Sequence, residues 1–422
     1  MNLDFGGHIM KRKALKQIED WYEQNYSTPL LIAGPKGVGK TYLAFEFLKE
    51  YSGNKVYINF EVNPAIKELF ESKSIHDNIN RINAYFHLET DCHTLIILDE
   101  FDLCESILLL LQTNTLQYDN YHFILISSYS QYQPSSSERC GYDLIRLSPL
   151  DFEEFLEASS NVWYISVIKE HYYSNHPIPD IVHQDILNLF YEYLITGGMP
   201  AALNEYFALN SPLNVSEKHK ILFSYIVGTL KSLVSESEYI KICQLIDTID
   251  VQLAKKNKKF QYILIRKGCT RAQFQEALTT LANCDIIYRC PHLTNQKSEK
   301  IYLFDTGLLL SKAKVSFPNS VVDLESEFYK GLIENYIAQT LHNHYHELFY
   351  WDSGSLASIS FVLKAGEYYK PIEVFQNDST RSKAVSIFKE QYQVNESIKI
   401  SLKNFSKQKN VKYVPVYASF CI

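Results

Sequence analysis

Several common sequence features are missing from this chain of 422 residues. No apolar run reaches the length of a membrane span, and the densest one, Ile107–Leu111, is far too short. The first residues, Met1–Lys13, contain no apolar signal core. A membrane-spanning protein is therefore not expected, and a cytoplasmic location without a membrane partner is the default expectation.

The cysteines form no Cys-x-x-Cys pair and no Cys/His cluster with the spacing of a zinc site. Neither a disulfide framework nor a structural zinc site is therefore expected, and free, reduced thiols are the favoured interpretation. The eight cysteines are Cys92, Cys104, Cys140, Cys243, Cys269, Cys284, Cys290 and Cys421.

A surplus of positive charge is also missing, because the formal net charge is −7 at pH 7. This balance argues against a protein that is coated by nucleic acid over its whole surface. The charge is uneven, however: residues 255–300 contain ten Lys and Arg against three Asp and Glu, and residues 364–412 contain ten against five. These stretches can meet phosphate, but a solvated basic face or a face that docks on an acidic domain is an equal alternative.

A glycine-rich segment joins a strand-like run, Leu30–Ala33, to an amphipathic one, Tyr42–Tyr51. Its spacing, Gly-x4-Gly-Lys-Thr, is that of a phosphate-binding loop. In such a loop backbone N–H groups surround the β-phosphate, Lys40 reaches the β- and γ-phosphate oxygens, and the Thr41 hydroxyl can ligate Mg²⁺. The positive end of the following helix favours the same anion. The predicted nucleotide-binding residues are Gly34, Pro35, Lys36, Gly37, Val38, Gly39, Lys40 and Thr41.

For the loop itself, an ordinary glycine-rich turn is the alternative. A second motif lies where a phosphate-binding loop predicts one. Thr94–Leu98 is an apolar run of buried-strand length that ends in two carboxylates, Asp99 and Glu100. Beside a phosphate-binding loop, Asp99 is expected to hold Mg²⁺ through water and Glu100 to polarise the attacking water. The pair predicts ATP hydrolysis, and a buried strand that ends in solvated acids is the alternative.

Strand-like and helical segments alternate through the first third of the chain, which is typical of an α/β protein with a mostly parallel sheet. The expected strands are Pro29–Ala33, Lys55–Glu61, Thr94–Asp99, His122–Ser128 and Leu144–Leu147. Ser128 ends the fourth strand, where a polar side chain can sense the γ-phosphate. A simple cap is the alternative.

The pattern becomes helical from 151 to about 235 and then changes again. Tyr239–Ile249, Phe260–Lys267 and Arg271–Asn283 have helical patterns, and the strands Ile286–Cys290 and Ile301–Phe304 follow. Three helices and a hairpin predict a winged-helix unit, with Arg271–Asn283 as its recognition helix. Such units also serve as protein-interaction lids, which is the competing interpretation.

The last hundred or so residues predict a further helix-and-strand arrangement of the order αβββαββ. The expected elements are the helix Ser326–His344, the strands Leu348–Trp351, Ile359–Leu363 and Pro371–Phe375, the helix Arg381–Gln391, and the strands Ile398–Leu402 and Tyr413–Tyr417.

Six motifs in this chain resemble those of the prokaryotic AAA-type ATPases with a C-terminal DUF4143 domain. The phosphate-binding loop and Leu98-Asp99-Glu100 are shared by many P-loop proteins. The other four motifs are more specific in this order: Leu147–Phe155, Gly197–Pro200, Tyr302–Leu308 and Gly331–Asn335.

The resemblance implies four domains and the cofactors ATP and Mg²⁺. The four domains are an AAA+-like P-loop core at 1–155, a helical lid at 156–235, a winged helix at 236–305 and a restriction-endonuclease-like α/β domain of the PD-(D/E)xK type at 306–422. The family usually has Gly-Arg shortly before the Leu-x-Pro-Leu motif, an arginine that enters a neighbour's site. Arg139 is the candidate for this role here, and an exposed loop arginine is the alternative.

The C-terminal domain departs from the family pattern where a nuclease would hold its metal. Family members show Glu-Val-Asp-Phe and then Ile-Glu-Val-Lys, whereas this chain has Ser358–Phe361 and Ile372–Phe375. Glu334 and Glu373 remain as ligands, and a serine hydroxyl is a poor substitute for an anionic oxygen. We therefore expect an inactive nuclease-like domain, with an active nuclease that uses an unrecognised third ligand as the alternative.

Together these patterns predict an ATPase whose output is a conformational change in a binding platform. The platform would bind DNA through Lys255–Lys259 and Arg271. A nucleotide-gated protein-interaction switch without a nucleic-acid role is the second hypothesis. A homo-oligomer is expected if an arginine acts in a neighbouring site.

Overall fold

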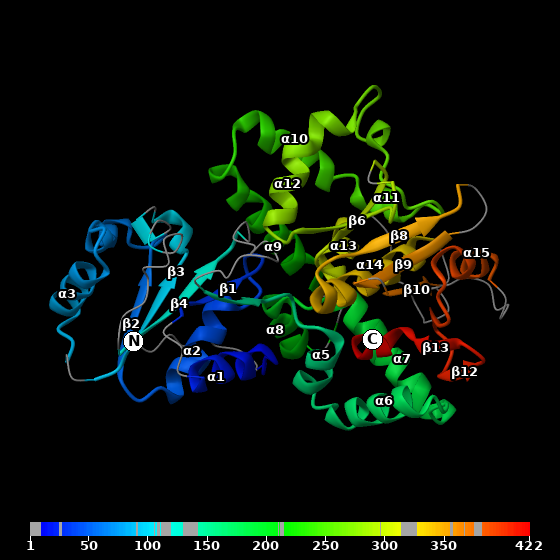
Figure 1. Cartoon of the computed structure of the whole chain (residues 1–422), viewed down its shortest axis with the longest axis horizontal. Coiled ribbons are helices and arrows are strands. Elements are labelled where there is room, and N and C mark those ends of the chain that lie inside the picture. Colours follow the sequence, from blue (N-terminus) through cyan, green and yellow to red (C-terminus); the bar gives the residue numbers. More distant parts are fainter. Residues whose placement is uncertain are drawn as a thin grey trace. The chain divides into compact units, whose positions relative to one another are not determined.

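The computed structural model describes residues 10–24, 28–89, 92–104, 106–107, 110, 120–129, 142–209, 211, 215–295, 297–313, 327–354, 358–366, 368–374 and 382–422. These residues form two compact units (Figure 1). The first contains the described residues from 11 to 148 together with 283–285. The second contains Met10 and the described residues from 149 to 282 and from 286 to 422.

The first unit is built on a sheet whose described strands are all parallel, in the order β2-β3-β4-β1-β5. The strands are β1 (Leu30–Ala33), β2 (Asn54–Asn59), β3 (Thr94–Asp99), β4 (Tyr121–Ser127) and β5 (Asp143–Arg146). The helices and 3₁₀ turns are α1 (Ala14–Glu23), α2 (Lys40–Glu50), η1 (Pro64–Phe70), α3 (Ile75–Phe86) and η2 (Phe101–Leu103). The strand order brings the carboxyl ends of β1, β3 and β4 to one edge, where open α/β sheets bind their ligands.

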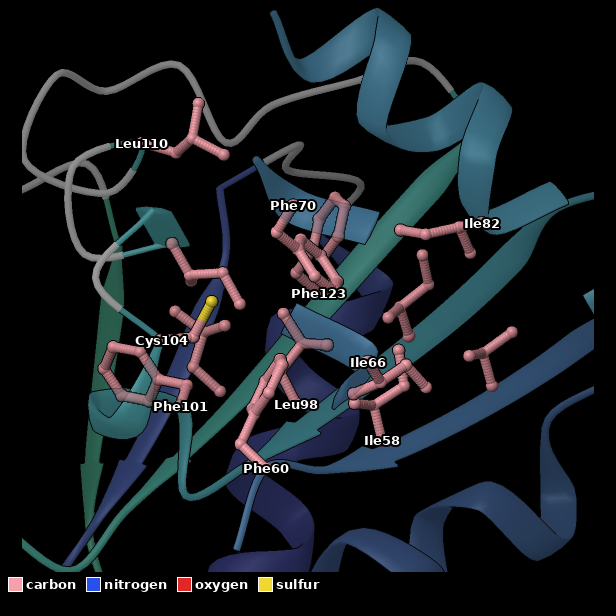
Figure 2. Close-up of a cluster of buried hydrophobic side chains, with 14 of the residues drawn as sticks. Ile58, Phe60, Ile66, Phe70, Ile82, Leu98, Phe101, Cys104, Leu110 and Phe123 are labelled. Atoms are coloured by element: carbon pink, nitrogen blue, oxygen red, sulfur yellow. The ribbon is translucent and has the colours of Figure 1, made fainter. Parts of the chain in front are cut away.

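A buried apolar cluster fixes one face of this sheet (Figure 2). Alternate residues of the strands, such as Ile58, Leu98 and Phe123, pack there against η1 and α3. The strand β3 is buried along its whole length, which explains its continuous apolar sequence. This packing holds the ends of β2, β3 and β4 in a fixed relation to one another.

The second unit begins with helices and continues with a hairpin. Its first helices are α5 (Phe152–Ala158), α6 (Val162–Ser174), α7 (Asp180–Thr196), α8 (Pro200–Leu209) and α9 (Val215–Thr229). After them come η4 (Leu230–Ser232), α10 (Glu236–Ile246), α11 (Ile249–Leu253), η5 (Tyr262–Leu264), η6 (Arg271–Phe274) and α12 (Gln275–Asn283). The hairpin strands are β6 (Ile287–Pro291) and β7 (Glu299–Leu303), and they pair in the antiparallel sense.

The remainder of the second unit contains a mixed sheet of the order β12-β13-β11-β10-β9-β8 within the described residues. Its strands are β8 (Phe349–Asp352), β9 (Ser358–Ala365), β10 (Tyr368–Val374), β11 (Ser397–Ser401), β12 (Ser406–Gln408) and β13 (Val411–Pro415). The helices here are α13 (Thr306–Lys312), α14 (Glu327–Tyr345) and α15 (Lys383–Tyr392), and the chain ends in η8 (Val416–Cys421).

Most of the expected elements are confirmed, and three expectations differ. The predicted helix Phe260–Lys267 is wrong, because only the short turn η5 forms there. Helix α13 and the edge strand β12 were not expected, since α13 follows β7 at once and β12 is only three residues long. The α/β class with a parallel central sheet is confirmed for the first unit. The division into four domains stays a prediction.

Three of the four more specific motifs named above meet in one buried cluster of hydrogen bonds in the second unit. The backbone N–H of Leu150 donates to the carbonyl of Gly198, and the N–H of Gly198 donates to Asp305 Oδ2 at 2.7 Å. Asp305 also caps α13 by accepting from Leu308 N–H at 2.8 Å. A Cβ on Gly198 would lie 2.0 Å from the carbonyl oxygen of Leu150, so a side chain does not fit. These contacts join three segments that are far apart in the sequence, and they explain the motifs by packing.

The fourth specific motif clamps the hairpin to helix α14. Asn335 Oδ1 accepts from the N–H of Leu303 at 2.7 Å, and Asn335 Nδ2 donates to the carbonyl of Leu303 at 2.8 Å. Both groups are buried, so the amide side chain replaces a backbone partner that β7 lacks at this position. The motif that begins at Gly331 is therefore explained by packing.

No helix in the described part of the chain combines the length and the apolar character that a bilayer span requires. The cysteines among the described residues are free thiols, as expected, and three of them, Cys104, Cys284 and Cys290, are buried. Cys140 lies outside the described residues.

Candidate functional site: a phosphate-binding loop beside paired carboxylates

The loop between β1 and α2 has the backbone that its glycines permit. Gly37 and Gly39 have φ angles of 85° and 97°, in the left-handed region that favours glycine. Gly39 stands directly before α2, and Val38 is buried. The loop therefore turns back over the first turn of α2, where unpaired N–H groups and the helix dipole favour an anion.

Lys40, the first residue of α2, is buried, and its ammonium group is held by the loop itself. Nζ donates to the carbonyls of Gly34 at 2.9 Å and Pro35 at 3.0 Å, and to Ser128 Oγ at 3.1 Å. Burial lowers the pKa of Lys40, and the carboxylates of Glu100 and Asp99 oppose this shift. A buried ammonium with only neutral oxygens as close partners is well placed to take a phosphate in their place.

The two predicted metal ligands lie side by side. Thr41 Oγ1 donates to Asp99 Oδ2 at 2.8 Å, although the two residues are 58 positions apart in the sequence. Asp99 ends β3, and its Oδ2 also accepts from Tyr57 at 2.8 Å and from Asn59 at 3.3 Å. Burial raises the pKa of Asp99, and the hydrogen bonds from Thr41 and Tyr57 oppose this shift.

These oxygens fit a magnesium ion by their chemistry, since Mg²⁺ prefers hard oxygen donors and commonly uses one or two protein oxygens together with phosphate. Thr41 and Asp99 would hold the ion. Tyr57 and Asn59 come from β2, whose last residue is in register with Asp99. Their hydrogen bonds to Oδ2 orient the carboxylate of Asp99.

Glu100 lies directly after β3 and has a left-handed backbone, with φ at 52°. Its Oε1 accepts from Ser128 Oγ at 2.9 Å and lies 3.2 Å from Lys36 Nζ. Lys36 Nζ is also 2.7 Å from Glu61 Oε2. Ser128 thus accepts from Lys40 and donates to Glu100, so it joins the loop lysine to the predicted base.

A third carboxylate, that of Asp102, contacts the residue next to Ser128. Asp102 of η2 accepts from Ser127 Oγ at 2.5 Å, and Ser127 also accepts from the N–H of Tyr129. Burial raises the pKa of Asp102 to about 7. The carboxyl group therefore supports the end of β4, next to Ser128.

A buried arginine, Arg12, binds the loop through hydrogen bonds to backbone carbonyls. Arg12 Nη1 donates to the carbonyl of Val38 at 2.7 Å, and Nη2 donates to the carbonyl of Ser148 at 2.6 Å. On the same side, the N–H of Leu147 donates to the carbonyl of Ala33, the last residue of β1. The loop is thus tied to the residues that end the first unit.

The structure brings together all predicted nucleotide-site residues except Arg139, which lies outside the described residues. Sequence reasoning missed four others that the fold adds to the site: Arg12, Tyr57, Asn59 and Asp102. For Tyr57 and Asn59 a signal was present, because polar residues near the carboxyl end of a strand adjacent to β3 point to the ligand edge. Arg12 gave no such signal, since its partners are backbone carbonyls.

The two glutamates that the sequence suggested as metal ligands, Glu334 and Glu373, have other partners. Glu334 Oε1 accepts from Lys300 at 2.8 Å and from Tyr302 at 2.7 Å, and its Oε2 lies 3.8 Å from Lys258 Nζ. Glu373 is buried, accepts from Ser382, and its Oε2 lies 3.6 Å from Lys399. Among the described residues no group of three His, Cys, Asp or Glu side chains is arranged to hold a metal ion. Phe375 lies outside these residues.

Comparison with known domain families gives two matches within the chain. Residues 26–156 match an AAA domain. Residues 187–319 match a domain of unknown function, DUF8612. The first match supports the AAA-type ATPase of the resemblance. The second names a different family from DUF4143 and covers mostly residues before 306, so the DUF4143 domain is not confirmed.

Two of the solved structures that are similar to this chain illustrate the low identity of these matches. One is the Walker-type ATPase Paby2304 of Pyrococcus abyssi, with 15% identity, a TM-score of 0.45, and coverage of 72% of this chain and 96% of that chain. The other is a chain from a structure of Drosophila ORC bound to DNA, with 11% identity, a TM-score of 0.29, and coverage of 74% and 90%. None of the curated proteins compared with the chain matches it. The family match shows that residues 26–156 are similar to an AAA domain.

Proposed function

We propose that this protein binds ATP with Mg²⁺ in the loop Gly34–Thr41 and hydrolyses it. Lys40 and the loop N–H groups take the phosphates, Thr41 and Asp99 hold the ion, and Glu100 is the general base. The ion, when bound, neutralises phosphate charge. Ser128 keeps the base in place through its hydrogen bond to Oε1.

One observation carries this proposal: the hydrogen bond of 2.8 Å between Thr41 and Asp99. It joins the two sequence motifs at the ligand edge of a parallel sheet, beside a buried lysine. A glycine-rich turn without a ligand would not need a buried ammonium next to two strand-end carboxylates. The match of residues 26–156 to an AAA domain is independent support.

Calorimetric titration with Mg-ATP tests binding, and phosphate release tests turnover. The wild-type chain should bind and hydrolyse ATP, and Lys40→Ala should lose both because no other side chain replaces the buried ammonium. Lys49→Ala is the matched control, since Lys49 is an exposed lysine of the same helix whose partner is Glu46. Absence of heat in the wild-type titration, or equal turnover in wild-type and Lys40→Ala protein, would contradict the proposal.

The output of the ATPase is proposed to be a change in the second unit. Leu147 and Ser148 touch the end of β1 and, through Arg12, the loop. Two residues later, Leu150 is held by Gly198 and by the hydroxyl of Tyr193 at 2.8 Å. The short connection 147–150 is thus anchored at both ends, and a change at the loop can pass along it.

DNA binding by the second unit has less support than the count of basic residues indicates. Half of the ten basic residues between 255 and 300 are in ion pairs with buried or half-buried carboxylates of the same unit. These five are Lys258, Lys259, Arg271, Arg289 and Lys300. The exposed side chains of α12 include Gln275, Glu276 and Thr279, none of them basic. This observation favours the second candidate, a nucleotide-gated protein-interaction switch.

A salt series of DNA filter binding separates the two outputs. The exposed basic side chains left in this stretch are Lys256, Arg266, Lys267 and Lys297. Four phosphate contacts would give a slope of log K against log salt of about −3 to −4. A slope near zero with and without ATP supports the switch, and a steep slope that Lys267→Gln reduces by about one supports DNA.

A further inference from the structure

The phosphate-binding loop contains a second lysine, Lys36, whose position differs from that of Lys40. Lys40 is buried under the loop, where it contacts the carbonyls of Gly34 and Pro35. Lys36 Nζ lies between two carboxylates, 2.7 Å from Glu61 Oε2 and 3.2 Å from Glu100 Oε1. The loop thus carries one ammonium group on the inner side and one beside the proposed base.

The contacts of Glu100 determine which of its oxygens can act. Lys36 and Ser128 both contact Oε1. In the described residues neither a hydrogen bond nor an ion pair reaches Oε2. One oxygen therefore orients the carboxylate, and the other can accept a proton from water. The backbone of Glu100 is left-handed, a conformation that is uncommon for this residue type.

The two carboxylates beside Lys36, those of Glu61 and Glu100, differ in how far they are exposed to water. The side chain of Glu61 is 53% exposed, that of Glu100 is 15% exposed, and that of Lys36 is 16% exposed. Exposed ion pairs contribute little because water and salt screen them. A γ-phosphate carries more charge than Glu61 and would lie in a less exposed place, so it competes well for the ammonium group.

We propose that Lys36 acts in cis as the cation for the γ-phosphate, exchanging Glu61 for a phosphate oxygen while it stays beside Glu100. This inference rests on the proposed function. The attacking water lies between Glu100 and the γ-phosphorus in that reaction, and an ammonium group 3.2 Å from the carboxylate is within reach of both.

The step is a simple hydrolysis. The water oxygen forms a bond to the γ-phosphorus, the bond from that phosphorus to the bridging oxygen of the β-phosphate breaks, and Glu100 takes the proton of the water. ADP and phosphate leave, and the proton passes to solvent. Lys36 forms no covalent bond and stays charged. It stabilises the charge on the phosphoryl oxygens, which is the role that an arginine from a neighbouring subunit fills in related NTPases.

Lys36→Gln and Lys36→Arg test this role, with Lys49→Gln as the charge-matched control on α2. We expect Lys36→Gln to lower kcat by about 10²–10³, somewhat less than the 10³–10⁵ of an arginine finger. Its affinity for Mg-ADP should change less than threefold, while tight binding of ADP with aluminium fluoride should be lost. Lys36→Arg should recover most of kcat, and Lys49→Gln should equal the wild type. Wild-type kcat per site should not change with protein concentration.

Glu61→Gln separates a catalytic from a merely structural role. If the Glu61–Lys36 pair only shapes the loop, Glu61→Gln should lower kcat as much as Lys36→Gln, and that result overturns the inference. If Lys36 serves the γ-phosphate, Glu61→Gln should keep kcat at the wild-type level or above it. Full turnover of Lys36→Gln overturns the inference and leaves the proposed function intact. A wild-type protein that binds no nucleotide overturns both.

Discussion

The two units each contain a cluster of lysine and glutamate side chains. The clusters differ in how many oxygens of the glutamate carboxylate have a partner. In the first unit Glu100 uses one oxygen for Ser128 and Lys36. In the second unit Glu334 uses both oxygens, one for Lys300 and Tyr302 and the other for Lys258. The same residue types can thus form a reactive site or a fully paired ion cluster.

The surroundings explain this difference. Glu100 follows the end of a parallel strand, where the chain turns and side chains face a ligand edge. Glu334 lies within helix α14 and is covered by the hairpin β6–β7. Burial alone raises the pKa of Glu334, but the ammonium groups of Lys300 and Lys258 lower it overall. A buried carboxylate that is paired in this way stays ionised and contributes to the fold.

The largest effect is expected at Glu100. Glu100→Gln keeps the hydrogen bond from Ser128 but cannot accept a proton, so kcat should fall by about 10²–10⁴. Binding of Mg-ATP should be retained. Single-turnover phosphate release and a binding titration on the same preparation measure the two quantities. Near-normal turnover of Glu100→Gln would mean that another group is the general base. Glu100 and Glu334 would then no longer differ in catalytic role.

At Glu334 the same substitution should act on stability. Glu334→Gln leaves Lys300 and Lys258 buried without a counter-charge, which should cost about 3–5 kcal/mol of unfolding free energy. Chemical denaturation measures the loss. Glu327→Gln on the same helix is the control, since its pair with Lys330 is half exposed and should be worth less than about 1 kcal/mol. Equal stability of the two variants would argue against the structural role of Glu334.

A smaller loss of stability is expected from the clamp on β7. Asn335→Leu keeps the branched shape of the side chain but leaves the N–H and the carbonyl of Leu303 without their side-chain partner. With a cost of about 1 kcal/mol for each unpaired group, the lower end of the usual range, about 2 kcal/mol in total is expected. A thermal shift measures it, and ATP turnover per folded molecule should be unchanged. A variant as stable as the wild type would show that water satisfies these groups.

The smallest effect is a pH dependence at Asp102. Burial raises its pKa to about 7, so the folded state keeps a proton that the unfolded chain releases at lower pH. Stability should therefore fall as the pH rises toward 7 and level off above it, with a loss of about 1 kcal/mol between pH 6 and pH 8. Asp102→Asn should flatten this part of the profile in thermal unfolding. A profile identical to that of the wild type would assign the pH dependence to other groups.

Much of the first unit could be predicted from the sequence because its signals are local. A loop with fixed glycine spacing and an apolar run that ends in acids each report their own conformation, and the strands are confirmed within one or two residues. The predicted helix Phe260–Lys267 failed for the opposite reason. Its apolar residues mostly do not face a core, since Ile263 and Leu264 are exposed, so periodicity alone did not stabilise a helix.

The roles of the charged residues could not be predicted in the same way. A count of Lys and Arg between 255 and 300 gives an excess of charge, but pairing of Arg271 with Glu299 or Lys259 with Asp352 depends on strands far away in the sequence. Asp305 and Asn335 belong to motifs that resemble a functional signature, yet their partners are backbone groups. Only contacts across the fold distinguish these cases.

The sequence by itself determined the phosphate-binding loop, the paired acids after β3 and the parallel α/β class of the first unit. These follow from backbone freedom, strand burial and short-range spacing. The tertiary structure decided which carboxylates are paired and which keep an oxygen for chemistry. It also placed Lys36 beside Glu100, because the distance between two side chains from different strands and loops is set by packing of the whole unit.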